Sequence, residues 1–449
     1  MIKIMVEILS FICLLIAILG YYKHKLVFNP ITSMFALWGI ILTFSNMGLY
    51  SVNVPRDKFY IIIALGLLGY LIGVLFGSTK VKLRKEKLDN RKFNFEYCIN
   101  YSLMNFLGII TLIYYFIQFL IVVRLLLSGY DYSYIRLLAV SQEENILRSS
   151  QLFVVLNNFI ASPVTYLMIA LLPIEIFFGK KKKFFILECI GVMMLFVLTT
   201  GGRSVILWIG LYFLCVFFIY LKYSGKKKFY ISKKYKRIIF FGGILLFLFL
   251  FYMTKSRKGD DVDFLQQLFV YFVAPLPHAD CFFDVVDHSG RFGYGVSSFY
   301  GLFYPLFFLF RLVGIFNDYP EFITQIRYMS FEMMETGSYI GGGLYMNAFV
   351  TVFYQPYLDG RYLGVFLILL IFGYMCGFFF KKAYYSFDVQ AILIYILLLQ
   401  KILFSFVRFY FTQQAQSICF ILAFVVITKK IIDKRKKSIT NDFCNYTSL

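Results

Sequence analysis

The chain has 449 residues, of which 60% are hydrophobic, 21% are aromatic and only 15% are charged. Soluble domains average about 45–50% apolar and about 25% charged residues, so this composition excludes an ordinary soluble protein. The net charge is +21, but the basic residues lie in short segments between apolar runs, where they set membrane orientation and contact anionic lipids. The sequence therefore predicts an integral membrane protein and argues against nucleic acid as a partner.

Apolar runs long enough to cross a bilayer recur along the chain. About 18–20 apolar residues span the hydrocarbon core, and such a segment must be helical because its backbone groups have no water to bond. The first run is interpreted as a retained span, because no small-residue cleavage site follows it. We expect spanning helices at residues 4–22, 27–50, 59–77, 99–127, 151–178, 184–200, 204–221, 238–253, 362–380, 389–407 and 415–428.

The basic segments between these runs fall on one side of the predicted membrane. The positive-inside rule makes that side cytoplasmic. The opposite side receives residues 128–149 and a large insertion over 254–361, which is rich in Asp, Tyr, Phe and Gly. The basic segments are Lys23 with Lys25, residues 78–98, Lys180–Lys183, Lys222–Arg237, Lys381 with Lys382, and residues 429–437.

This pattern predicts an all-α polytopic membrane protein with about 11–13 transmembrane helices and a large external insertion late in the chain. Residues 299–316 and 346–357 are apolar enough to add one span and its return. Eleven and thirteen crossings both place the N-terminus outside. The predicted parts are an N-terminal transmembrane bundle over 1–253, an external region over 254–361, C-terminal spans over 362–428 and a basic cytoplasmic tail over 429–449.

Arg203 is the first candidate functional residue. It follows Thr200, Gly201 and Gly202 between two apolar runs, on the predicted outer face. The glycines permit a tight turn or the close approach of a ligand, and the guanidinium offers a planar fork for phosphate oxygens. The alternative is a snorkelling arginine that closes a hairpin.

A second group of candidates lies early in the insertion. His278 is a natural general base near neutral pH, and the carboxylate of Asp280 can orient its ring. Arg291 follows, just before Gly293 and Gly295. The alternative interpretation is that these are solvated loop residues, with Asp280 capping a helix. The spacing matches no known metal site, and the cysteines form no CxxC pair.

A third group lies at the end of the insertion. Asn347, Tyr357, Asp359 and Arg361 frame an aromatic stretch at the mouth of a predicted span. Aromatic faces can stack on sugar rings and carboxylates can accept hydroxyl protons, so this pattern indicates a sugar-binding ledge. The alternative is an ordinary helix start with Asp359 near the N-terminus. Arg408, beside Tyr410, Gln413 and Gln414, is a further candidate for phosphate contact.

These segments, in this order, resemble the Wzy-type O-antigen or oligosaccharide repeat-unit polymerases. The likeness rests on Thr200–Arg203, on Tyr271–Asp280 with the glycines at 293 and 295, and on Tyr345–Asn347 followed by Tyr357–Gly360 and Gly364. The resemblance implies a glycosyltransferase on the outer face of a bacterial inner membrane. It would transfer a growing chain from one undecaprenyl diphosphate carrier to a repeat unit on another, making O-antigen, as in lipopolysaccharide, or capsule. It implies no metal or other cofactor, and a chain-length regulator as a further partner.

In such a reaction, arginines neutralise the leaving diphosphate and a base activates the acceptor hydroxyl. We expect Arg203 to contact the diphosphate and His278 or Asp280 to act as the base. Arg291, Arg361 and Arg408 are further external cations. Two alternatives remain: a lipid-linked oligosaccharide flippase, which needs a polar cavity through the spans, and an O-antigen ligase, which differs in its acceptor. The sequence has no nucleotide-binding or zinc-protease motif, which argues against an ATP-driven pump or a metalloprotease.

Overall fold

The computed structural model describes residues 2–81, 95–140, 145–202, 204–225, 264–347 and 349–431. Within these ranges eight helices are long and apolar enough to cross a membrane, and four shorter apolar helices accompany them. The predicted fold class, an all-α polytopic membrane protein, is therefore confirmed.

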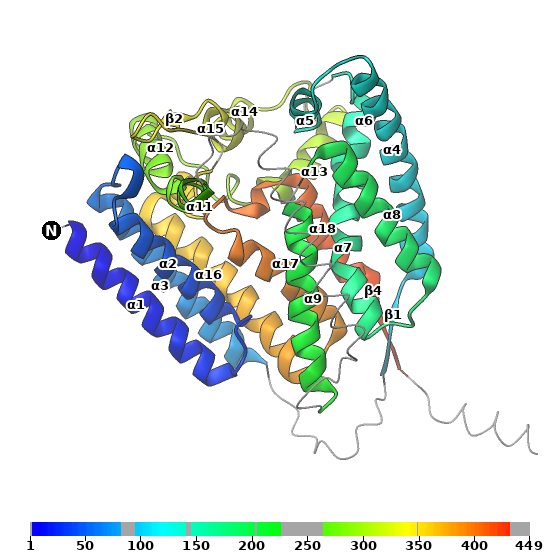
Figure 1. Ribbon diagram of the computed structural model, residues 1–449, viewed down its shortest axis with the longest axis horizontal. Coiled ribbons are helices and arrows are strands. Elements are labelled where there is room, and N and C mark those ends of the chain that lie inside the picture. Colours follow the sequence, from blue (N-terminus) through cyan, green and yellow to red (C-terminus); the bar gives the residue numbers. More distant parts are fainter. Residues whose placement is uncertain are drawn as a thin grey trace, which may run out of the picture.

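Figure 1 shows how the described helices are arranged. In the first half of the chain they are α1 (Ile2–His24), α2 (Pro30–Asn46), α3 (Asp57–Lys80), α4 (Tyr101–Leu127), α5 (Tyr132–Val140), α6 (Gln151–Leu156), α7 (Ser162–Phe177), α8 (Lys183–Thr200) and α9 (Ser204–Tyr223). The second half contains α11 (Phe264–Val273), α12 (Pro275–Ser289), α13 (Tyr300–Leu312), α14 (Glu321–Arg327), α15 (Met333–Glu335), α16 (Tyr354–Ser386), α17 (Val389–Leu403) and α18 (Gln414–Val426). Two short antiparallel sheets pair β1 (Phe95–Ile99) with β4 (Ile427–Ile431) and β2 (Ser338–Tyr339) with β3 (Tyr345–Met346).

All but one of the predicted spans coincide with these helices. The exception, residues 238–253, lies outside the described residues. The apolar run 299–316 forms α13, which has only 13 residues. The predicted return span over 346–357 is wrong, because the chain there passes from β3 through an irregular segment and enters α16 only at Tyr354. That irregular segment makes its hydrogen bonds to another part of the chain rather than within a helix.

Side chains that satisfy free backbone amides begin several of the helices. Asn29 accepts a hydrogen bond from the amide of Thr32 at 2.9 Å, and Pro30 occupies the first turn of α2. Asp388 accepts from the amide of Ala391 at 3.1 Å at the start of α17. Such caps replace the partners that the first turn of a helix lacks, and proline has no amide hydrogen to lose there. They set where α2 and α17 begin.

Helices α3 and α16 pack closely because glycines face each other across the contact. A Cβ atom built on Gly73 would lie 2.1 Å from the carbonyl oxygen of Leu370, and one built on Gly373 would lie 2.1 Å from that of Tyr70. Small residues spaced four apart allow the backbones of two membrane helices to touch. This contact joins the predicted N-terminal bundle directly to the C-terminal spans, so the two are not separate layers.

Helix α17 runs through the centre of the molecule. Every residue from Ala391 to Ile402 is buried. It lies between the group formed by α1, α2, α3 and α16 and the group formed by α4, α7, α8 and α18 (Figure 1). Apart from Gln400 and Lys401 near its end, this buried stretch consists of hydrophobic residues, as expected for a helix in a core position.

The two ends of the bundle differ in chemistry. At one end the ammonium of Lys222 lies 3.4 Å from the centre of the Tyr384 ring, and Lys381 donates to the carbonyl of Ser78 at 2.6 Å. This end, called the basic end below, also carries β1 and β4 and is the one predicted to face the cytoplasm. The other end, called the outer end, carries α5, α12, α14, α15 and β2 (Figure 1). The structure thus gathers these basic contacts at one end and several short elements of the predicted insertion at the other. Helices α11 and α12 also belong to the insertion, but their stretch Leu265–Ser289 is one of the eight long enough and apolar enough to cross a membrane, which differs from the predicted external position of residues 254–361.

Candidate functional site

An ion-paired network at the outer end joins the start of α3 to α12. Arg56 donates from Nε to Asp280 at 2.9 Å, from Nη2 to the same carboxylate at 3.1 Å, and from Nη1 to Asp284. Its backbone amide also donates to Asp280. The hydrogen bonds to Asp280 and Asp284 raise the pKa of Arg56, which keeps the guanidinium charged. Lys58 pairs with Asp287, one turn further along α12.

Helix α16 adds a third element to this network. Its helical geometry breaks at Gly360 and Arg361, where Arg361 has φ of +51°. This break directs the guanidinium of Arg361 to Asp287, with Nε 3.2 Å from Oδ1, and to the carbonyl of Val286 at 2.6 Å. The hydroxyl of Tyr357 donates to the same carboxylate at 2.8 Å. Tyr357 and Arg361 thus hold α12 in place, and the ring of Tyr357 is buried rather than offered to a sugar.

Asp359 accepts hydrogen bonds from the loop that contains Ser297 and Ser298. Its carboxylate accepts hydrogen bonds from the backbone amides of Ser297 at 2.9 Å and Ser298 at 2.8 Å. A Cβ on Gly293 would lie 2.3 Å from Oδ1 of Asp359, so glycine permits this close approach. The predicted sugar-binding ledge is therefore wrong for Asp359, because both of its carboxylate oxygens accept hydrogen bonds from backbone amides.

His278 and Asp280 do not form the predicted pair. Positions two apart on a helix point in different directions. The Nδ1 atom of His278 lies 2.8 Å from the hydroxyl of Ser338 in β2, while Asp280 is bound by Arg56. His278 is fully buried, and its Nε2 atom has no partner among the described residues. Neither side chain can reach a bulky acceptor in this arrangement.

The connection between α17 and α18, residues 404–413, is recessed below the outer end. Helix α17 has 15 residues and α18 has 13, so each is about 20 Å long at 1.5 Å per residue, against roughly 30 Å for a hydrocarbon core. In Figure 1 this connection lies below the level of α5 and α14. Irregular backbone at membrane depth is tolerated where it is enclosed by protein or lines a polar cavity.

Backbone hydrogen bonds tie this connection to the irregular segment before α16. The amide of Val350 donates to the carbonyl of Val407 at 2.9 Å, and that of Val352 donates to Ser405 at 2.7 Å. Thr351 and Arg408 form an isolated parallel bridge. The two segments therefore support each other below the outer end, which explains how non-helical chain is stable there.

Charged and polar side chains lie in and beside this connection. Arg408 is half-buried and interacts electrostatically with Tyr410 and with Glu335 of α15. Glu335 itself is exposed. In the last turn of α17, the ammonium of Lys401 is buried and donates to the Gln416 side chain of α18 at 3.2 Å. A guanidinium, an ammonium and a carboxylate thus lie around the non-helical segment between two short helices.

The remaining predicted residues lie apart from this connection or outside the described chain. Arg291 and Asn347 are exposed at the outer end. Arg203 is not among the described residues, but Gly201 just before it ends α8 with φ of +61°. This left-handed conformation favours glycine, and Arg203, two residues further on, lies outside the described residues. The Tyr132 neighbour of Gly201 donates to the carbonyl of Leu198 at 3.4 Å.

Sequence reasoning missed Arg56, Lys58 and Lys401. Arg56 and Lys58 flank the start of a predicted span, where basic residues are ordinary, and only the fold brings α12 to them. Lys401 lies inside an apolar run, and a charge in a membrane span is a functional signal by itself. That signal was present in the sequence at Lys401.

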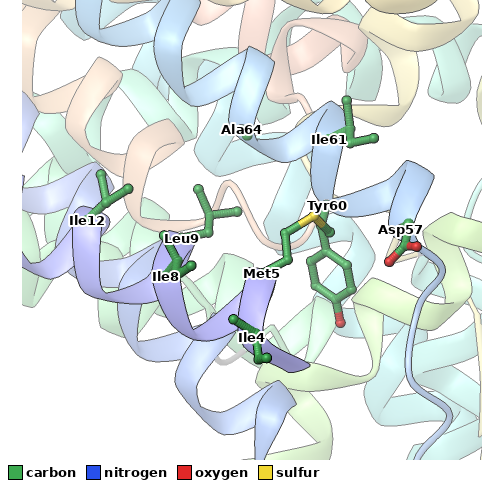
Figure 2. Close-up of a pocket in the computed structure, with 9 residues that line it drawn as sticks. All are labelled: Ile4, Met5, Ile8, Leu9, Ile12, Asp57, Tyr60, Ile61 and Ala64. Atoms are coloured by element: carbon green, nitrogen blue, oxygen red, sulfur yellow. The ribbon is translucent and has the colours of Figure 1, made fainter. Parts of the chain in front are cut away.

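An apolar groove lies between α1 and α3. Figure 2 shows this groove between α1 and α3, lined by side chains such as Ile8, Ile12 and Ile61, with Asp57 and Tyr60 at one end. Several of these side chains are exposed on the membrane-facing surface. Apart from Asp57 and Tyr60, the side chains that line the groove are apolar.

Among the described residues, no group of three or more His, Cys, Asp or Glu side chains is arranged to hold a metal ion. Comparison of the chain with protein-family models, with curated proteins and with solved structures gave no match.

Proposed function

We propose that this protein is a glycosyltransferase that polymerises undecaprenyl-diphosphate-linked oligosaccharide repeat units on the outer face of the inner membrane. The observation that carries the proposal is the position of Arg408. Its guanidinium lies in a recessed, non-helical segment between two helices too short to cross the membrane. A lipid diphosphate has its charged group at this depth, next to the hydrocarbon.

The reaction transfers one sugar chain between two oxygen atoms. The bond between the anomeric carbon of the donor glycan and the diphosphate oxygen breaks, and the hydroxyl oxygen of the acceptor sugar forms the new bond. The polyprenyl diphosphate leaves with the bonding electron pair, and the acceptor proton passes to a base. A fixed cation near the leaving oxygen stabilises the charge that develops there by several kcal/mol.

Arg408 is suited to contact the diphosphate, and Glu335 is suited to act as the base. Glu335 is exposed at the outer end and lies close enough to Arg408 to interact with it electrostatically. An exposed carboxylate can reach an acceptor sugar, whereas His278 and Asp280 are buried. In this proposal Glu335, rather than His278 or Asp280, is therefore the base that accepts the proton of the acceptor hydroxyl.

The test is chain growth by the purified protein in lipid vesicles supplied with polyprenyl-diphosphate-linked repeat units. Arg408→Ala is expected to lower the rate by about 100-fold, as the loss of one electrostatic group does in comparable sites. Glu335→Gln is expected to lower it similarly, because it removes the base but preserves the shape of the side chain. Arg291→Ala is the control, since it removes an exposed arginine from the same end.

Chain growth at an unchanged rate in Arg408→Ala contradicts the assignment of that residue. A wild-type protein that binds the lipid substrate but never joins two repeat units contradicts the function itself.

A lipid-linked oligosaccharide flippase is a second candidate, and one observation favours it. Lys401 and Gln400 are buried within the bundle, and both side-chain amide atoms of Gln400 have no partner among the described residues. Polar groups inside membrane helices mark the path of a transported substrate in many carriers. Movement of a fluorescent lipid-linked oligosaccharide between the leaflets of protein-containing vesicles, without chain growth, distinguishes the flippase from the polymerase.

A further inference from the structure

Lys401 is a charged side chain in the interior of a membrane protein. It is 3% exposed and belongs to α17, the helix that is buried on all sides. Among the described residues, no carboxylate lies within ion-pair distance of it, although the network at the outer end pairs its arginine and lysine with aspartates. An unpaired buried charge is costly, so a group in this position needs a partner.

The groups around Lys401 supply too few hydrogen-bond acceptors. An ammonium has three donors and a glutamine amide nitrogen has two. The acceptor that the structure places on the ammonium is Oε1 of Gln416 at 3.2 Å, and the ring of Phe411 lies 5.2 Å from the nitrogen. The Nε2 atom of Gln416 is buried and has no partner among the described residues. The pair is therefore positively charged and rich in donors.

These properties fit an anion with several oxygen atoms. Lys401 lies in the last turn of α17, and the helix is followed directly by the recessed connection that contains Arg408. Gln416 lies in the first turn of α18, on the other side of the same connection. A group bound there would lie between the ends of two half-length helices, which is a common position for ligand sites in membrane proteins.

We propose that Lys401 and Gln416 bind the phosphate oxygens of a ligand that reaches the ends of α17 and α18 from the outer end. The ammonium supplies charge and the Gln416 amide supplies a directed hydrogen bond. The phosphate can come from the headgroup of a polyprenyl lipid or from a free diphosphate. The choice of a polyprenyl diphosphate as the lipid rests on the proposed function, whereas the binding of phosphate oxygens does not.

The test is equilibrium binding to the purified full-length protein in detergent, measured by native mass spectrometry. The probes are polyprenyl diphosphate, the uncharged polyprenol and inorganic diphosphate. Lys401→Met replaces the ammonium with an apolar side chain of similar length, a change that is often neutral or stabilising at buried charges, so the variant is expected to fold. Lys382→Met removes the same charge from the basic end and is the matched control, and Lys401→Arg retains the charge.

We expect wild-type protein to prefer the polyprenyl diphosphate to the polyprenol. Lys401→Met is expected to bind the diphosphate about 10- to 100-fold more weakly, the range for loss of a charged hydrogen bond. Lys382→Met is expected to bind it normally. Competition by inorganic diphosphate at low concentration identifies the free anion as the ligand, and its failure to compete identifies the lipid.

Equal binding by wild type and Lys401→Met overturns the inference, as does equal binding of the polyprenol and its diphosphate by wild type. Chain growth is measured separately on the same preparations. A Lys401→Met protein that binds normally but does not polymerise overturns the inference and leaves the proposed function standing. A wild type that binds through Lys401 but does not polymerise supports the inference and contradicts the proposed function.

Discussion

Arg56, just before α3, donates hydrogen bonds to the carboxylate of Asp280 in α12, a residue 224 positions later. The donors are its backbone amide and two side-chain nitrogens. Asp284 completes the coordination of the guanidinium. The contact connects the first third of the chain to the insertion at the outer end. It also explains why α12, which is rich in carboxylates, can be stable at the edge of the bundle.

Replacement of Arg56 by Ala is expected to destabilise the protein. The loss leaves Asp280, which is largely buried, without its charged partner, and we expect a cost of about 1–3 kcal/mol because Arg56 itself is half exposed. Thermal unfolding in detergent measures the effect, with Arg291→Ala as the control. An unfolding temperature equal to that of wild type would show that the network does not support the fold.

The glycines between α3 and α16 are expected to be intolerant of any side chain. Gly73→Ala places a Cβ against the carbonyl of Leu370 and should cost about 1–3 kcal/mol through forced separation of the helices. Gly210→Ala in α9 meets open space, and its higher helix propensity should be neutral or stabilising by up to about 1 kcal/mol. Thermal unfolding of the two variants, measured under the same conditions, tests this difference. An equal decrease in unfolding temperature in both variants would contradict close packing of α3 against α16 at Gly73.

Asp359→Ala is expected to release the loop that contains Ser297 and Ser298. Two buried amides lose a charged acceptor, which we expect to cost about 2–4 kcal/mol. Limited proteolysis of the loop and thermal unfolding report the change, and Asp318→Asn at an exposed position is the control. Gly293→Ala should act in the same direction, because its Cβ would displace the Asp359 carboxylate. Resistance to protease in both variants would argue against this role.

Cysteine labelling is expected to report which way the bundle faces. Cys281 of α12 is exposed, whereas the other cysteines whose side chains the structure describes are buried. With Cys98 and Cys444 replaced by serine, a membrane-impermeant maleimide added to intact cells should label Cys281. In a background without Cys281, a cysteine in place of Lys382 at the basic end should react only after the membrane is opened. The reverse pattern would place the outer end in the cytoplasm and remove the basis for an extracytoplasmic transferase.

The candidate site was only partly predictable from the sequence. Arg408 was identified because an arginine beside Tyr410 stands out at the end of an apolar run. The predicted pairing of His278 with Asp280 was wrong because residues two apart in sequence point in different directions on a helix. The sequence also did not show that both side chains are buried. Arg56 could not be identified, since its partner is on a distant helix that only folding brings close.

The sequence by itself indicated where most of the apolar helices lie and which connections are basic. Hydrocarbon thickness sets the length of an apolar run, and charge decides which connections stay on one side, so both can be read residue by residue. Only the tertiary structure decided that α17 and α18 stop short of the outer end and that Lys401 and Arg408 lie at the connection between them. Those features depend on how the helices pack and on which distant segments supply hydrogen bonds to the irregular chain, and these are properties of the whole fold rather than of any local stretch.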